Sequence, residues 1–243
     1  MGRVTVVGGC RAKAPSTGIL ASSLAVGTTV KLMEGSTAVE YLVVNQGIPS
    51  NSSLYDASCD GTWLLRKELH SNRQWHTSNV NKYESSAINT WLNGEFFNAL
   101  GSAEQAAIKQ VKIPYRYNGG AGGTDQRGAN GLLCKIFLLS GYEVGWTTNY
   151  NQYFPQDGAR LSYFEAGTGT TANNKRIAKL NGTAATWWLR SPTTSDAILV
   201  WGVYSDGTIA GGDASNSYGI RPALVLPSTA LFDASTLILK GVA

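Results

Sequence analysis

Residues 187–226 read WWLRSPTTSDAILVWGVYSDGTIAGGDASNSYGIRPALVL, and this stretch organises the rest of the chain. It opens with the apolar block Trp188–Pro192 and closes with a second such block, Gly219–Leu224. The residues between the two blocks are small, polar or aromatic, with many Gly, Ser, Thr and Asp. Rigid ends around a polar middle are typical of a scaffold that presents a variable surface on its loops. We interpret the middle as a binding face and not as a catalytic centre.

A hairpin is expected at the centre of this stretch. Asp206-Gly207 predicts a type I′ turn, because such a turn needs a positive φ at both central positions. The turn would join a strand at Ala197–Tyr204 to a strand at Thr208–Gly211. Strand alternation then places Trp201 and Tyr204 on opposite faces of this ribbon.

The candidate ligand-binding residues are polar and aromatic side chains of the ribbon and of the loop before it. Tyr, Ser, Gly and Asn are common in adaptable binding surfaces, since Tyr offers a large contact area for few rotatable bonds. Trp201 is also a candidate for the core, because it lies among aliphatic residues in mid-strand. The full set is Thr193, Thr194, Ser195, Asp196, Trp201, Tyr204, Asp206, Thr208, Asp213, Ser215, Asn216 and Tyr218.

The composition argues against several function classes. The chain has 243 residues, of which 43% are hydrophobic, so it can bury a sizeable core. Only 15% of the residues are charged, and the net charge of +4 is not concentrated in any run. Nucleic-acid binding needs a concentrated basic surface, so we do not expect it. No apolar run approaches the roughly 20 residues that span a bilayer, so we expect no membrane insertion.

The first 23 residues, rich in Gly, Ala and Ser, predict a leader segment that becomes ordered only against a partner. The ligand-binding domain is expected to comprise residues 24–243. The leader lacks the features of a signal peptide, so we expect synthesis in the cytoplasm. Three cysteines cannot form a full disulfide framework. A Cys59–Cys134 bridge is one alternative, and free buried thiols are the favoured one.

Strands are predicted in several places before this stretch. Thr28–Met33 and Val39–Asn45 predict a hairpin around a Gly35-containing turn. Trp63–Leu65 predicts a short buried strand, and the apolar run Cys134–Leu139 predicts a central strand. Asn118–Gly131 contains six glycines and predicts a flexible surface loop.

Two helices are predicted in the middle of the chain. Ser85 or Ser86 can cap the first, whose apolar residues recur at helical spacing on one face. Ser102 and Gln105 predict a capping box at the start of the second.

Five blocks together carry a family resemblance that covers most of residues 24–226. They are Trp63–Arg66, Trp91–Asn93 with Phe96-Phe97, Glu104–Ile108, Trp188–Pro192 and Gly219–Leu224. Their order and spacing resemble a domain family of undefined function that is common in Gram-positive gut bacteria and their phages. That family resembles a branch of the C-type lectin fold shared by formylglycine-generating enzymes and by variable proteins of diversity-generating retroelements.

The resemblance implies an α+β domain with a C-type lectin-like fold. In this fold two N-terminal helices would pack on small antiparallel sheets, and a C-terminal β-hairpin would display the ligand surface. Two departures limit the resemblance. The EPN or QPD motif of calcium-dependent sugar sites is missing, and all three cysteines precede residue 135, unlike the C-terminal pair of formylglycine-generating enzymes. We therefore expect neither catalysis nor a bound metal or cofactor.

The function that the resemblance implies is non-catalytic receptor binding. The chain would be an adhesin of a phage tail, of a tail-fibre tip or of a bacterial cell surface. Its hypervariable surface at residues 193–218 would bind a host-cell surface protein or glycan. The leader would dock onto other virion or tail proteins, and a homotrimer is one possible assembly.

The rigid blocks are expected to hold the ends of the ribbon. Each arginine in them would bond to backbone carbonyls and to a nearby carboxylate, for which Glu143 and Glu165 are the candidates. The expected scaffold residues are Trp188, Arg190, Pro192, Arg221 and Pro222.

Two other functions stay open. One is an enzyme related to sulfatase-modifying enzymes, with a pocket lined by Glu143, His76 or Cys134. The other is a virion decoration or baseplate protein without receptor binding. A zinc site is not expected, because the histidines and Cys59 match no known ligand spacing.

Overall fold

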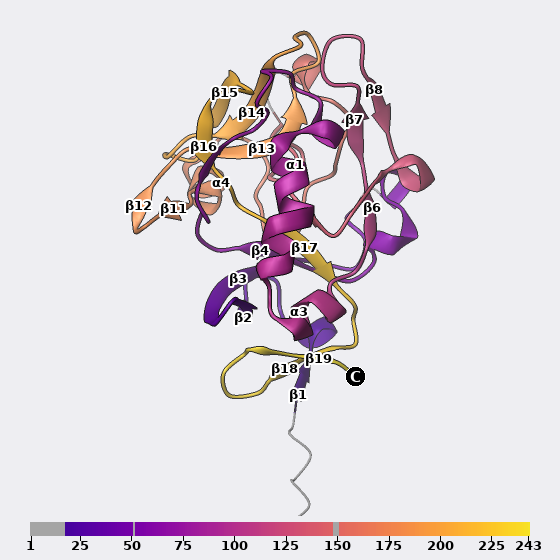
Figure 1. Ribbon diagram of the computed structural model, residues 1–243, viewed down its shortest axis with the longest axis vertical. Helices are drawn as coiled ribbons and strands as arrows, with labels where there is room; N and C mark the ends of the chain where they lie inside the picture. The colour runs from indigo at the N-terminus through magenta and orange to yellow at the C-terminus, as the bar shows by residue number, and fades with distance from the viewer. Residues whose placement is uncertain (1–17, 51, 148–150) are drawn as a thin grey trace, which may run out of the picture.

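The computed structural model describes residues 18–50, 52–147 and 151–243. Most of the regular structure is β-strand, built around a hydrophobic core that both large sheets share. Figure 1 shows the C-terminus at one end of the molecule, beside a small antiparallel sheet. This sheet consists of β1 (Gly18–Leu20), β18 (Ala230–Asp233) and β19 (Leu239–Val242).

The first of two five-stranded sheets has the order β10-β17-β4-β3-β2 and is antiparallel. The predicted hairpin is confirmed, since two of its strands pair around a two-residue turn in which Gly35 takes a φ of 59°. The predicted buried strand at Trp63–Leu65 is also confirmed. The strands are β2 (Thr29–Glu34), β3 (Thr37–Gln46), β4 (Thr62–Arg66), β10 (Ile136–Phe137) and β17 (Ala223–Leu226).

The second five-stranded sheet has the order β15-β14-β13-β16-β5 and contains the predicted ribbon. Its central strand, β13, is buried over its whole length and pairs in parallel with β16, while the other pairs are antiparallel. The strands are β5 (Asn72–Gln74), β13 (Trp187–Pro192), β14 (Leu199–Val203), β15 (Ile209–Asp213) and β16 (Ser217–Gly219).

The apolar run at residues 134–139 does not form the central strand that was predicted. It is divided between two sheets, because β9 ends at Cys134 and β10 begins at Ile136 on the edge of the first sheet. The side-chain oxygen of Asn93 accepts hydrogen bonds from the backbone N–H groups of Lys135 and Ile136 and so fixes this break. The paired short strands are β6 (Val111–Ile113) with β9 (Leu132–Cys134), β7 (Tyr115–Tyr117) with β8 (Thr124–Gln126), and β11 (Lys179–Leu180) with β12 (Thr183–Ala184).

The first predicted helix is confirmed. It runs through α1 (Ala87–Trp91), the π-helical segment η5 (Leu92–Phe96) and α2 (Phe97–Ala99). The Ser86 hydroxyl caps it by accepting a hydrogen bond from the N–H of Asn89 at 3.0 Å.

The second predicted helix, α3 (Ser102–Ala107), is present, but its capping box is wrong. Its N-cap is Gly101, and the Gln105 side chain instead donates to the carbonyl oxygen of Leu100 at 2.7 Å. A further helix, α4 (Thr170–Arg176), was not predicted, because its Thr and Asn residues have weak helix propensity. The single-turn 3-10 segments are η1 (Ala21–Ser23), η2 (Ser52–Leu54), η3 (Ala57–Cys59), η4 (Tyr83–Ser85), η6 (Gly128–Asn130) and η7 (Asn151–Tyr153).

The predicted fold class, a C-type lectin-like α+β domain with two N-terminal helices on small sheets, is wrong. Five strands precede α1, and both predicted helices lie in the middle of the chain. The second of them, α3, has only six residues and follows Gly101, whose backbone is extended. The two large sheets form most of the framework, and the predicted display hairpin is built into one of them.

Part of the predicted leader belongs to the fold. Residues 18–23 form β1 and η1, and β1 pairs with β18. Residues 1–17 of the leader, including Cys10, lie outside the described residues. Cys59 and Cys134 are free and buried, as the favoured alternative predicted.

Candidate ligand-binding surface

The predicted hairpin is present, but its turn differs from the prediction. β14 and β15 pair along their whole lengths. The N–H of Tyr204 donates to the carbonyl oxygen of Thr208, and the N–H of Gly207 donates to that of Tyr204. Gly207 has a φ of 82°, whereas Asp206 accepts hydrogen bonds from the backbone and hydroxyl of Thr208. This is a three-residue loop, a type I turn followed by one left-handed residue, in place of a type I′ turn.

The hairpin tip is not free, because it rests on α4. A Cβ atom on Gly207 would lie 2.0 Å from the carbonyl oxygen of Asn173, so only glycine fits this contact. Tyr204 remains 45% exposed beside the tip, and Asp206 is exposed. The tip is thus part of the scaffold, with two side chains facing solvent.

Two of the three large aromatic residues of the ribbon, Trp201 and Tyr218, pack against the protein itself. Trp201 stacks on Phe154 at 4.6 Å between ring centroids and donates from its indole nitrogen to the carbonyl oxygen of Tyr153. Tyr218 packs on the buried Trp188 at 4.4 Å. Both side chains are half-buried and pack against the hydrophobic core. Trp201 is therefore partly a core residue, which is the alternative that its mid-strand position suggested.

The remaining predicted residues form two groups at opposite ends of the hairpin. Five residues at about 3.3 Å each separate these ends by roughly 17 Å, so they do not form one compact face. We call the loop and turn at the open end the hairpin-base surface, with Ser195, Ala197, Asn216 and Ser217 exposed on it. The predicted residues at this end are Thr193 (buried), Thr194, Asp196, Asp213 and Ser215 (half-buried), and Ser195 and Asn216; those at the tip are Tyr204, Asp206 and Thr208.

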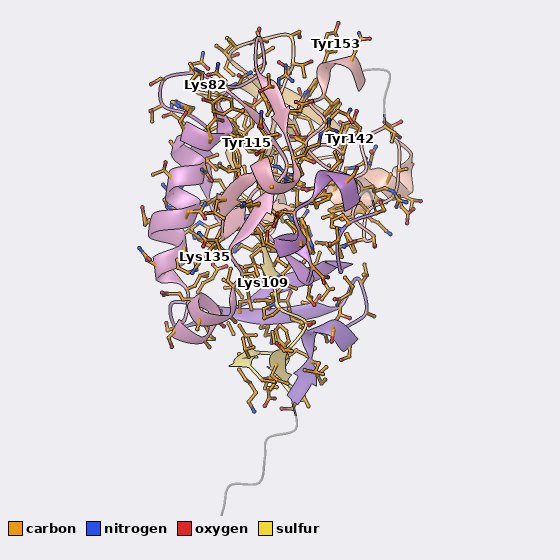
Figure 2. The ribbon with its side chains drawn as sticks, turned by 90° about the vertical axis from the view of Figure 1, so that its right-hand side faces the viewer. Lys82, Lys109, Tyr115, Lys135, Tyr142 and Tyr153 are labelled. Carbon is orange, nitrogen blue, oxygen red and sulfur yellow. The ribbon has the colours of Figure 1, made fainter. Side chains whose placement is uncertain are left out.

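Asn81 holds the hairpin-base surface in place. Its amide nitrogen donates to the carbonyl oxygens of Asp196 and Leu199 at 2.9 and 2.8 Å, and its oxygen accepts from the N–H of Gly120 at 2.8 Å. Only 1% of Asn81 is exposed. One buried side chain therefore joins three loops. Figure 2 shows Lys82, the residue after Asn81, at the same end of the molecule as Tyr153, whose carbonyl oxygen accepts a hydrogen bond from the N–H of Thr194.

The glycine-rich segment at residues 118–131 lies largely at the surface, as predicted, but it is partly regular, and Gly119 and Gly120 are buried. It contains β8 and η6, and the N–H of Ala121 donates to the carbonyl oxygen of Asp196. A Cβ atom on Gly120 would lie 1.9 Å from the carbonyl oxygen of Thr193. The glycine permits this close approach between two loops.

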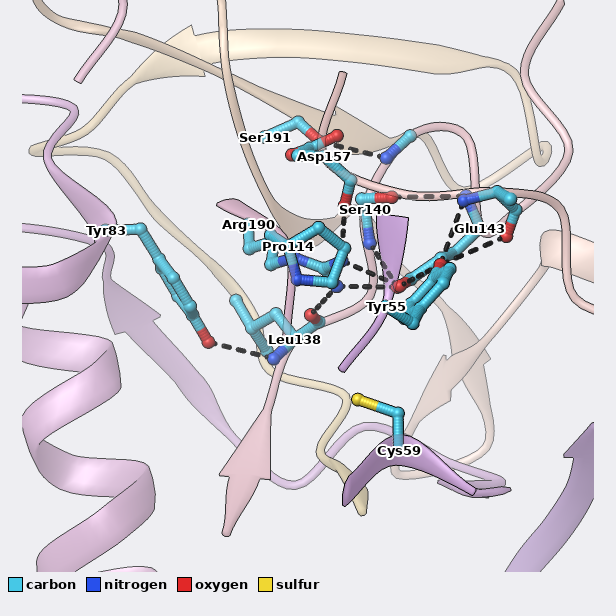
Figure 3. A network of polar contacts seen from close by, with 12 residues as sticks. Tyr55, Cys59, Tyr83, Pro114, Leu138, Ser140, Glu143, Asp157, Arg190 and Ser191 are labelled. Atoms are coloured by element: carbon cyan, nitrogen blue, oxygen red, sulfur yellow. Dashed lines mark hydrogen bonds and ion pairs between the residues drawn. The ribbon is translucent and has the colours of Figure 1, made fainter. Parts of the chain in front are cut away.

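A buried ion pair fixes the strand that leads into the hairpin-base surface. The Arg190 guanidinium binds both carboxylate oxygens of Glu143, at 2.5 and 2.7 Å, and both side chains are fully buried. It also donates to the carbonyl oxygens of Pro114, Leu138 and Asp157 (Figure 3). The predicted structural role of Arg190 is confirmed, with Glu143 as its carboxylate partner.

Glu143 connects this pair to two further segments. The Tyr55 hydroxyl donates to it at 2.9 Å, and the N–H of Ser140 donates at 2.9 Å. Burial alone would lower the pKa of Arg190, but the adjacent Glu143 carboxylate more than offsets this and raises the pKa above its ordinary value. The pair is thus charged and saturated with hydrogen bonds, which is the condition for a buried ion pair to persist.

Arg221 has the predicted backbone contacts but not the predicted carboxylate. It donates to the carbonyl oxygens of Arg66 and Lys67 and lies 5.1 Å from the centre of the Trp187 ring. Burial lowers the pKa of Arg221 to about 10. The other candidate partner, Glu165, pairs with Lys175 on the surface. The expected scaffold residues Trp188, Pro192 and Pro222 are buried.

The groups of the alternative enzyme hypothesis do not form an open site. Both oxygens of Glu143 are occupied by Arg190. Burial raises the pKa of Cys134 well above its ordinary value and that of Cys59 to about 12, so both thiols stay protonated. His76 accepts a hydrogen bond from the N–H of Ser78, and burial lowers its pKa. The described residues contain no cluster of three or more His, Cys, Asp or Glu that could hold a metal ion.

The chain matches a family model described as a domain of unknown function, DUF6273, over residues 60–228. The chain belongs to this family. The DUF6273 match contains Glu143 and Arg190, which form the buried ion pair. It also contains Asn81, and we call this residue, with its hydrogen bonds to the two neighbouring loops, the Asn81 clamp. No curated protein and no solved structure matches the chain. Among the described residues, none of the helices is long and apolar enough to cross a membrane.

Proposed function

We propose that this DUF6273 protein is a non-catalytic ligand-binding protein whose hairpin-base surface recognises a protein or glycan on a bacterial surface. The observation that carries the proposal is the Asn81 clamp, which joins three loops below exposed Ser195 and Asn216. Loops fixed in advance lose little conformational entropy on binding, so such a surface can bind tightly with few contacts. Display on a phage tail or on a bacterial cell surface is part of the same proposal.

Exposed and half-buried polar side chains at the two ends of the hairpin provide a matched test. The triple variant Ser195→Ala, Asp213→Ala, Asn216→Ala removes polar groups from the hairpin-base surface. The double variant Tyr204→Ala, Asp206→Ala alters the exposed tip as a control. None of these five side chains is buried, so the base variant should melt close to wild type.

The assay is binding of the labelled protein to a panel of intact Gram-positive bacteria and to a printed array of bacterial glycans. We expect the base variant to lose binding by tenfold or more and the tip variant to keep it. Full binding by a correctly folded base variant would show that the hairpin-base surface is not the ligand site.

A further inference from the structure

A groove of about 310 Å³ adjoins the hairpin-base surface. It lies where β5 and β16 meet the start of α1. The Gln74 side chain donates to the carbonyl oxygen of Ser215 at 2.8 Å, so the groove continues directly from the turn that carries Asn216. Its volume falls in the range of small-ligand sites, from about 300 Å³ upward. The lining residues are Asn72, Arg73, Gln74, Thr77, Ala87, Ile88 and Ser217.

Arg73 is positioned in the groove but weakly paired. Its guanidinium lies 4.1 Å above the Trp91 ring, and its Nε atom is buried without a hydrogen-bond partner among the described residues. Its ion-pair partner is Glu95, at 3.7 Å, on a side chain that is 74% exposed. Surface pairs of this kind contribute little to stability, so a ligand carboxylate can replace Glu95.

The rest of the lining is uncharged. None of the described residues along the groove is acidic, and its polar members carry amides or hydroxyls. No hydrogen bond within the described chain engages the side chains of Asn72, Thr77 and Ser217. Amides and hydroxyls both donate and accept, which suits the hydroxyl groups of a sugar ring. One guanidinium among such groups suits a single carboxylate, which it can bind with two parallel hydrogen bonds.

Two other anionic ligands fit less well. A nucleic acid needs several cations along its backbone, and the groove lining has one. An extended acidic peptide would add to the edge of β5. That edge is only three residues long, and α1 packs beside it, with the N–H of Ile88 donating to the carbonyl oxygen of Trp75.

We infer that this groove binds the carboxylate-bearing sugar of an acidic glycan, with Arg73 holding the carboxylate. The inference rests on the proposed ligand-binding function and names the chemical class of its ligand. The neighbouring hairpin-base surface would contact the rest of the glycan.

The test uses the full chain on an array in which each uronic-acid saccharide has a neutral counterpart. We expect wild type to prefer the acidic member. Arg73→Gln should lose this preference by roughly 10- to 100-fold, the usual effect of removing a hydrogen bond to a charged group. Glu95→Gln, a change at an exposed position, should strengthen acidic binding, because it removes the competing carboxylate. Arg127→Gln, at an exposed arginine outside the groove, should change nothing.

The outcomes separate this inference from the proposed function. Equal binding of acidic and neutral glycans by wild type, or an acid preference that persists in Arg73→Gln, overturns the inference and leaves the function standing. If the protein binds cells only before they are treated with protease, and does not bind the array, the ligand is a protein. This result also overturns the inference and leaves the function standing. Absence of binding to both cells and array overturns the function itself.

Discussion

Asp157 is the residue whose replacement most directly tests the electrostatics of the buried network. It is fully buried beside the Arg190–Glu143 pair, and its Oδ2 atom accepts a hydrogen bond from the Ser191 hydroxyl at 2.7 Å. Its Oδ1 atom is buried with no hydrogen-bond partner in the described part of the chain. Arg190 contacts the carbonyl oxygen of Asp157 and gives its paired N–H groups to Glu143. The Asp157 carboxyl therefore lacks an ion partner.

Burial raises the pKa of Asp157 from 3.8 to about 7, against the lowering effects of Arg190 and of the Ser191 hydrogen bond. The native protein then holds a proton that the unfolded chain releases above about pH 4. The contribution of this bound proton to the free energy of unfolding is fully present below about pH 4, and it is lost as the pH rises to about 7. At about 1.4 kcal/mol per pH unit, the loss across this window amounts to about 4 kcal/mol.

The perturbation is Asp157→Asn, which keeps the shape of the neutral acid and cannot ionise. Urea denaturation of both proteins at several pH values gives their free energies of unfolding. The difference should grow in favour of the variant by about 3 kcal/mol between about pH 4.5 and pH 7.5, because other titrating groups are common to both proteins.

Asp206→Asn is the matched control. Its hydrogen bonds with Thr208 lower the pKa of Asp206, so that carboxyl stays ionised throughout this range and the difference from wild type should be constant. A constant difference for Asp157→Asn as well would refute the reasoning, because it would mean that Asp157 does not change its charge in this window.

Two further changes test the scaffold by urea denaturation. Arg190→Met should destabilise the protein by about 3–5 kcal/mol, because it leaves Glu143 buried without a counter-charge; a loss under about 1 kcal/mol would contradict this. Gly207→Ala should cost about 1–3 kcal/mol, since the new Cβ atom meets the backbone of Asn173 and the residue must keep a positive φ. Gly122→Ala, which also has a positive φ but open space around it, should cost less, and an equal cost would exclude the contact as the cause.

The sequence predicts the parts of this protein that depend on local pattern. The strands around Gly35, the helix capped by Ser86 and the hairpin at residues 199–213 follow from turn residues and hydrophobic periodicity. The buried role of Arg190 also follows, because a guanidinium among apolar residues must find carbonyls and a carboxylate. The arrangement into two large sheets does not follow, because it depends on pairing between distant strands.

The clamp was missed for the same reason. Asn81 lies in a polar segment with no helical or strand pattern, and its partners are 39 to 118 residues away. The glycine at position 120 is compatible with a close contact between loops, but six glycines in one segment indicate flexibility as readily as close packing. The details of the hairpin turn were missed because the contact with Asn173 in α4 is also remote in sequence.

The structure separates two roles that the ribbon sequence mixes. Asp196 accepts hydrogen bonds from the N–H groups of Ile198 and Leu199, and Trp201 is stacked on the protein, so both residues are needed for the fold. Ser195 is exposed, and no side-chain hydrogen bond engages it within the described chain. A binding surface can change the ligand that it recognises only at positions whose side chains do not also hold the backbone in place. Substitutions that alter ligand choice are therefore expected at Ser195 and its exposed neighbours, while substitutions at Asp196 or Trp201 should first reduce stability.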